Sequence, residues 1–128
     1  MSRGREAGQS LAEFALSLLI LAMVVLGLMD FSRAMLAHNT VANAAREGAR
    51  YGVIHPDDAA KIKQAALALT VGLDNATVDV QRPASNVVEV VVTHTFHPVS
   101  LFVAGFLDGG SGVGFTMRAR SRMYVEGK

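Results

Sequence analysis

The chain has 128 residues, of which 51% are hydrophobic and only 18% are charged, a balance that excludes a disordered segment. Its 12 lysines and arginines nearly match 11 aspartates and glutamates, and a net charge of +1 argues against a dedicated nucleic-acid binder. The absence of cysteine excludes disulfides, cysteine-ligated zinc, iron–sulfur clusters and thiol catalysis. The length predicts one domain, or one small domain with an appendage.

The most informative segment is an apolar run from Leu11 to Met29. As a helix, these 19 residues span about 28 Å, close to the hydrocarbon thickness of a bilayer. A buried core helix is disfavoured, because so small a chain has too little material to surround it. A removable signal peptide is disfavoured because the run is long and contains Glu13 in its first turn. We therefore expect a single-pass membrane helix, although arginines on both sides leave its orientation open.

Helical periodicity continues after this run. Small and apolar side chains recur at three- and four-residue spacing, at Phe31, Ala34, Met35, His38, Val41, Ala42, Ala45 and Ala49. Asp30 and Arg33 are spaced to form a pair on the same helix face. We predict one helix from about residue 10 to 51, ended by Gly52, whose second half packs closely on a sheet or another helix.

Glu13 is costly at the start of a spanning segment. A carboxylate at the bilayer centre costs on the order of 2.5–3.5 kcal/mol, and less near an interface. The next basic residue along the chain is Arg33, too far away to reach it. Glu13 therefore either extends to the headgroups or pairs with a cation in trans, such as a newly made N-terminal amine.

Residues 8–14, GQSLAEF, follow a short basic leader and open the apolar helix. This arrangement resembles a class III signal of type IV prepilins. The resemblance implies that a prepilin peptidase cuts between Gly8 and Gln9, with the leader in the cytoplasm and the C-terminal domain outside. It also implies that Glu13 pairs with the amine of Gln9 on a neighbouring subunit. Many prepilins have an N-methylated phenylalanine where this chain has Gln9, so methylation stays open.

The resemblance extends from Gly8 to Tyr51, most specifically in NAAREGARY at residues 43–51. This segment is similar to TadE-like proteins, minor pseudopilins of the tight-adherence (Tad, or Flp) pilus system. Within it, Arg46, Glu47 and Arg50 have two interpretations. They form a solvated helix face, with Glu47 neutralising one charge, or a docking surface for sister subunits.

The remaining residues, 53–128, suit a small α+β unit. Pro56-Asp57-Asp58 predicts the start of a second helix, with an apolar stripe of Ile62, Ala66, Leu69 and Leu73 and an end near Gly72. Alternating residues predict strands at about 77–81, 87–97 and 113–125, with a turn at 82–86. The expected fold class is therefore α+β and pilin-like: a long transmembrane helix, a second short helix and a three-stranded antiparallel sheet. The expected divisions are a leader at 1–8, the helix at 9–52 and an extracytoplasmic domain at 53–128.

Arg118, Arg120 and Arg122 alternate along the last predicted strand and share one face. They form either a wet sheet face, partly neutralised by Glu89 or Asp79, or a contact surface for an acidic partner or anionic lipid. The apolar connector at 99–107 either closes the core or docks on another pseudopilin or the membrane.

No motif for catalysis is evident. The glycine-rich stretch at 109–114 lacks the lysine of a phosphate-binding loop. His94 and His97 are spaced to face opposite sides of a strand, which disfavours a metal site. We expect no enzyme activity, no cofactor and no metal.

Together these features predict a minor pseudopilin of a Tad-type pilus or related secretion apparatus, anchored in the cytoplasmic membrane. Its expected partners are a prepilin peptidase, sister pseudopilins or pilins, the pilus assembly platform and membrane lipid. The alternative is a membrane-tethered extracytoplasmic binding or sensing module, in which the helix is only an anchor. An extracytoplasmic enzyme is a third, weaker alternative.

Overall fold

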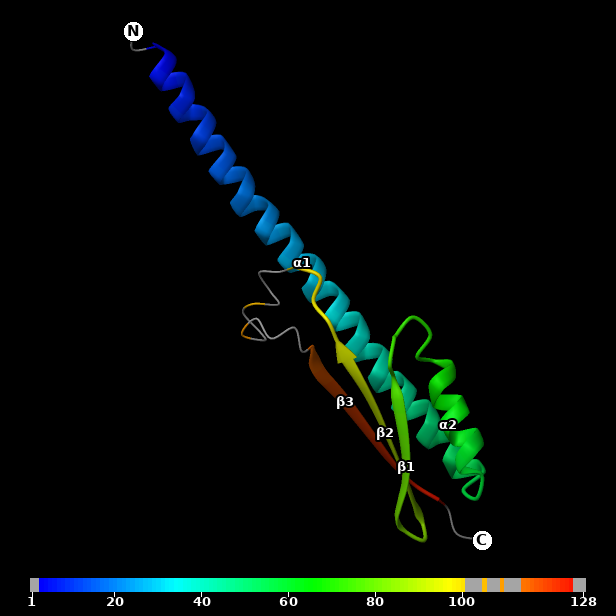
Figure 1. Ribbon diagram of the computed structural model, residues 1–128. Coiled ribbons are helices and arrows are strands. Elements are labelled where there is room, and N and C mark those ends of the chain that lie inside the picture. The colour runs from blue at the N-terminus through cyan, green and yellow to red at the C-terminus, as the bar shows by residue number, and fades with distance from the viewer. Residues whose placement is uncertain (1–2, 101–104, 106–108, 110–113, 126–128) are drawn as a thin grey trace.

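The computed structural model describes residues 3–100, 105, 109 and 114–125, and for residues 3–7 only the backbone. The chain folds as a long helix, α1 (Arg3–Ile54), a short helix, α2 (Ala59–Ala68), and three strands. Figure 1 shows the N-terminal half of α1 standing clear of the rest, while α2 and the sheet lie against its C-terminal half. The predicted α+β class, with two helices and a three-stranded antiparallel sheet, is confirmed.

Helix α1 is longer at both ends than the predicted range of 10 to 51. It begins in the polar leader and continues to Ile54, so Gly52 lies within it and does not end it. The stop comes from Pro56, because the residue before a proline is disfavoured in helical geometry, and here that residue is His55.

Gly52 has a packing role that the sequence analysis missed. A Cβ added there would lie 2.7 Å from Val88 Cγ1 and 3.2 Å from Ile62 Cδ1. At Gly48, an added Cβ would lie 3.0 Å from both Ala66 Cβ and Val90 Cγ1. Both glycines therefore let α1 approach α2 and the sheet more closely than any side chain would allow.

Helix α2 starts later than predicted. Asp58 is its N-cap and accepts a hydrogen bond from the Lys61 backbone N–H at 3.0 Å, while Pro56 belongs to the preceding turn. The helix ends at Ala68 with Leu69 as its C-cap, before Gly72. Gly72 instead adopts a φ of +88° in the following turn, a conformation that glycine favours.

The strands β1 (Thr77–Ala84), β2 (Val87–Phe96) and β3 (Phe115–Tyr124) form an antiparallel sheet in the order β1-β2-β3. Strand β1 is longer than predicted, because pairing continues past a register shift between Gln81 and Ala84. The turn is consequently shorter than the predicted range of 82–86. The irregularity contains Pro83, which an edge strand tolerates.

The core lies between α1, α2 and one face of the sheet. Small residues of α1 face the valines of β2, with Val78 of β1 also buried, as predicted. The fully buried or nearly buried members are Val41, Ala44, Ala45, Ala49, Ile62, Ala66, Val78, Val88, Val90 and Val92. Most of the predicted connector at 99–107 and of the glycine-rich stretch lies outside the described residues.

Candidate functional site

The N-terminal half of α1 presents apolar side chains in every direction. Every residue from Leu11 to Leu26 is exposed, including Leu11 at 70% and Phe14 at 66%. Burial of apolar surface is worth about 25 cal/mol per Å², so such a surface is unfavourable in water. The helix is long and apolar enough to cross a membrane, which fits a single-pass membrane protein.

The predicted cleavage residues lie at the start of this surface. Gly8 and Gln9 are both exposed, and no atom lies within 4 Å of a Cβ added at Gly8. The Gln9 side-chain amide donates a hydrogen bond of 3.1 Å to a carboxylate oxygen of Glu13, one turn later. Among the described residues, the donor to the Glu13 carboxylate is therefore the neutral amide of Gln9.

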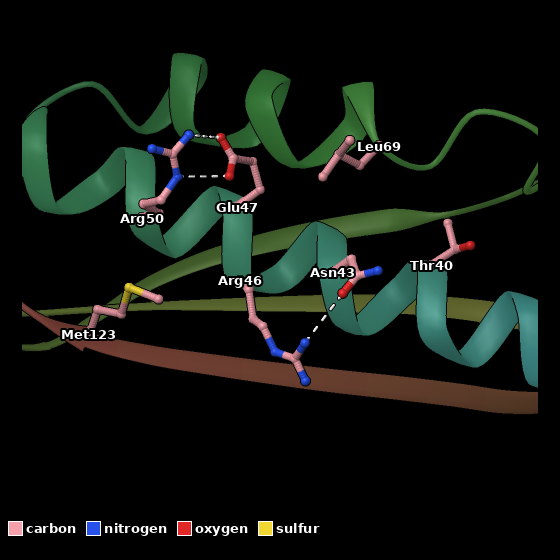
Figure 2. A pocket seen from close by; sticks show the side chains of 7 residues that line it. All are labelled: Thr40, Asn43, Arg46, Glu47, Arg50, Leu69 and Met123. Atoms are coloured by element: carbon pink, nitrogen blue, oxygen red, sulfur yellow. Dashed lines mark hydrogen bonds and ion pairs between the residues drawn. The ribbon is translucent and has the colours of Figure 1, made fainter.

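On the C-terminal half of α1, polar side chains line a shallow hollow of about 480 Å³ with Leu69 and with Met123 of β3. Figure 2 shows Arg50 and Glu47 on one side of the helix and Arg46 extending on the side of β3. Arg50 donates two hydrogen bonds to Glu47, at 2.5 and 2.9 Å. These bonds hold the pKa of the Glu47 carboxyl below its ordinary value and raise the pKa of Arg50.

Arg46 differs from Arg50. Its guanidinium donates only to the neutral Asn43 amide, at 3.2 Å, and forms no ion pair within the described part of the chain. Glu47 thus neutralises Arg50, whereas Arg46 has no acidic partner among the described residues.

The arginines of β3 lie on the face of the sheet opposite α1. Glu89, only 3% exposed, binds Arg122 at 2.6 Å and Arg120 at 3.3 Å. Of the two carboxylates considered from sequence, Glu89 therefore partly neutralises this face, whereas Asp79 accepts a hydrogen bond from Gln81. Arg118 forms no ion pair with any described residue.

The three groups of predicted residues are consequently separate. The cleavage residues lie near the N-terminal end of α1, and the polar hollow that includes Arg46 lies on its C-terminal half. The β3 arginines lie across the sheet. This distribution resembles several contact surfaces along a rod more than a single enclosed site.

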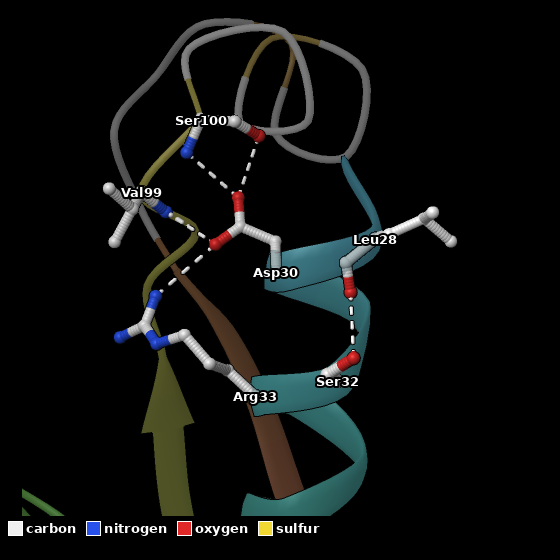
Figure 3. A network of polar contacts seen from close by, with 6 residues as sticks. All are labelled: Leu28, Asp30, Ser32, Arg33, Val99 and Ser100. Atoms are coloured by element: carbon white, nitrogen blue, oxygen red, sulfur yellow. Dashed lines mark hydrogen bonds and ion pairs between the residues drawn. The ribbon is translucent and has the colours of Figure 1, made fainter. Parts of the chain in front are cut away.

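Asp30 is a residue whose importance the sequence analysis only partly identified. The predicted pair with Arg33 is present at 3.2 Å. In addition, its carboxylate accepts hydrogen bonds from the backbone N–H groups of Val99 and Ser100, at 3.0 and 2.8 Å, and from Ser100 Oγ at 2.6 Å (Figure 3). The signal in the sequence was an acidic residue directly after an apolar span, but its distant partners were not visible there.

The positions of His94 and His97 differ from the prediction that they face opposite sides of one strand. His94 and His97 line the same small hollow, of about 210 Å³, because His97 lies beyond the end of β2. His94 is 7% exposed, and its Nδ1 has no hydrogen-bond partner among the residues that the structure describes. Among the described residues, no three histidine or acidic side chains are grouped so that they could hold a metal ion.

Comparison with known proteins matches residues 8–50 to the family described as TadE-like protein. The resemblance drawn from the sequence is therefore confirmed over this part of the chain. No curated protein and no solved structure shows significant similarity to the chain. The family suggests a role in Tad pilus assembly, with other pilus components as partners, and is not a known enzyme family.

Proposed function

We propose that this chain, TadE-like over residues 8–50, is a minor pseudopilin of a Tad-type pilus or related secretion apparatus. It is inserted in the cytoplasmic membrane with its leader inside, and its folded domain lies outside. A prepilin peptidase removes residues 1–8, and the new helix N-terminus then packs with sister subunits on the assembly platform. The protein acts by packing with other subunits and not by catalytic turnover.

One observation carries this proposal: the family match begins at Gly8 and covers a helix whose first half packs against no other described part of the chain. A helix that served only as an anchor would not need a carboxylate inside its apolar surface. A positive group supplied by assembly would offset the cost of placing the Glu13 carboxylate there. Cleavage after Gly8 would supply one, the amine of Gln9 on a neighbouring subunit.

The processing step is tested by mass analysis of the protein isolated from native membranes. We expect an N-terminus at Gln9 when the peptidase is active, and an N-terminus ahead of residue 8 when the peptidase gene is deleted. An uncut chain in the presence of active peptidase contradicts the proposal. The same spectrum reports whether Gln9 is methylated.

The pairing step is tested by Glu13→Ala, which leaves the cleavage residues in place. We expect normal cleavage but a severe loss of pilus assembly, because the subunit amine loses its partner. Ser17→Ala is the matched control, since its hydroxyl donates only to the Glu13 backbone carbonyl, at 2.8 Å. Normal piliation by the Glu13 variant would contradict the pairing role.

The alternative function, a tethered binding or sensing module, makes the opposite prediction for the span. If the helix is only an anchor, replacing residues 9–29 by an unrelated neutral spanning helix preserves function. If the helix packs with sister subunits, the same replacement abolishes assembly, although the folded domain still reaches the membrane.

A further inference from the structure

The turn after β2 is fastened to α1 at the point where the apolar span ends. Asp30 directly follows Met29, and its carboxylate binds Val99 and Ser100 through three hydrogen bonds of 2.6 to 3.0 Å. The Asp30 carboxylate is almost fully buried by these contacts. This Asp30 clamp, defined by Asp30, Val99 and Ser100, fixes one end of the folded domain beside the membrane boundary.

The helical rise sets the depth of these residues. At about 1.5 Å per residue, Phe31 lies about 3 Å beyond Met29 along the helix axis. The headgroup region extends roughly 5–8 Å beyond the hydrocarbon core on each side. With the span in the bilayer, Phe31 and the clamped Val99 are therefore at headgroup level.

Apolar side chains are exposed at this level, on Phe31 and Val99, and beside it on Phe115, which lines a hollow with Phe31. The exposed fractions are 64% for Phe31, 71% for Val99 and 38% for Phe115. Phe31 and Phe115 also line an apolar hollow of about 460 Å³, together with Gly27 of the span itself. The exposed apolar surface of the domain is thus continuous with the surface of the spanning helix.

The charges are arranged compatibly with a lipid surface. Asp30, the acidic group at the boundary, is withdrawn from solvent, and its charge is paired with that of Arg33. Arg33 binds it at 3.2 Å and keeps half of its own side chain exposed. A cation therefore lies at headgroup level, where phosphate groups are the natural counterion.

We propose that Phe31, Val99 and Phe115 form a membrane-contacting rim that rests in the lipid headgroup layer and is positioned by the Asp30 clamp. This inference rests on the membrane insertion contained in the proposed function. We assign this surface to lipid because it lies at headgroup depth, where its apolar side chains and the half-exposed Arg33 match the acyl chains and phosphates of a bilayer surface.

The test uses single cysteines carrying an environment-sensitive fluorophore, which is site-specific because the chain has no cysteine of its own. The full chain is reconstituted in phosphatidylcholine–phosphatidylglycerol vesicles with nitroxide-labelled lipids as quenchers. We expect a label at Val99→Cys to be quenched severalfold more by headgroup nitroxides than a label at Asn86→Cys. Asn86 is the control because it lies in the β1–β2 turn, at the other end of the sheet.

A label at Leu19→Cys, near the middle of the span, distinguishes failure of membrane insertion from failure of the membrane-contacting rim. If nitroxides deep in the acyl chains do not quench it, membrane insertion and hence the proposed function fail. If the Leu19 label is quenched but the Val99 label matches the Asn86 control, only the rim is contradicted. A blue-shifted Val99 label without lipid quenching points to a protein neighbour and likewise contradicts the rim.

The positioning role of the clamp is tested with Asp30→Asn and with the milder Ser100→Ala. We expect both to lower quenching of the Val99 label while quenching of a label at Phe31→Cys stays unchanged, because Phe31 is placed by the helix alone. Circular dichroism confirms that each variant remains folded. Unchanged Val99 quenching in both folded variants would contradict the clamp.

Discussion

The two halves of α1 belong to one uninterrupted helix but have opposite surfaces. From Leu11 to Leu26, large apolar side chains are exposed all round, whereas in the second half the side chains of Val41, Ala44 and Ala49 are completely buried. The first half carries leucines, valines and methionines, and the second half is rich in alanine and contains two tightly packed glycines.

This difference in surface shows that side-chain size decides what packs against each half of α1. Large apolar side chains suit lipid and neighbouring helices, which accommodate their bulk. Small residues allow a sheet to approach the helix backbone, so the second half is covered by its own chain. The stability of the folded domain should therefore depend on the second half alone.

The largest expected effect comes from filling the closest contact. Gly52→Leu places a side chain where even a Cβ would meet Val88 Cγ1 at 2.7 Å. Overpacking costs about 1–3 kcal/mol, and the upper end is expected here because two elements would have to move. Thermal unfolding in detergent, followed by circular dichroism, measures the loss. In the uncut chain, Gly8→Ala is the control, because the added Cβ meets nothing within 4 Å outside the local helix backbone, and it should leave the melting temperature unchanged.

A matched pair of truncations compares the halves directly. Val41→Ala removes a completely buried side chain and should destabilise the domain by about 2 kcal/mol. Leu21→Ala removes more atoms, but from a side chain that is 58% exposed, and should leave domain unfolding unchanged. Equal effects of the two substitutions on the melting temperature would contradict the division of α1 into two surfaces.

The smallest expected effect concerns pH. Lys61, through its side chain and backbone N–H, holds the pKa of the Asp58 carboxyl below its ordinary value of 3.8. A group with a lowered folded pKa stabilises the fold above its unfolded pKa, and this contribution is lost as pH falls through the folded value. The unfolding free energy should therefore decline slightly below about pH 4 in the native chain.

Asp58→Asn keeps the N-cap but cannot titrate, so it should flatten this part of the stability profile. Denaturant unfolding at a series of pH values measures the difference between the two chains. An identical acid slope in both would show that Asp58 is not the group responsible.

Much of the fold could be predicted because it depends on periodicity along the chain. The apolar run identified the span, and three- and four-residue spacing identified the rest of α1. Alternation placed Val78, Val88 and Val90 on the buried face of the sheet. The boundaries were less accurate, since Gly52 has the composition of a helix terminator and its tight contact with Val88 is not a local property.

The residues of the candidate site also differ in whether they could be predicted from local sequence. The motif that includes Gly8 and Glu13 is contiguous, so its resemblance was visible in the sequence and agrees with the family match. The pair of Asp30 with Arg33 was also visible, as an interval of three residues. The hydrogen bonds from Val99 and Ser100 to Asp30 join positions about seventy residues apart, and no local sequence pattern predicts them.

The sequence by itself determined which part of the chain suits lipid, because side-chain bulk and the absence of charge over the sixteen residues from Phe14 to Met29 are properties of the residues alone. Only the tertiary structure decided how the domain is attached to that helix. Glycine contacts, the burial of Asp30 and the pairing of Glu89 with two arginines all arise from groups that become neighbours on folding. Their free energies depend on desolvation and close contact, which exist only once the chain is folded.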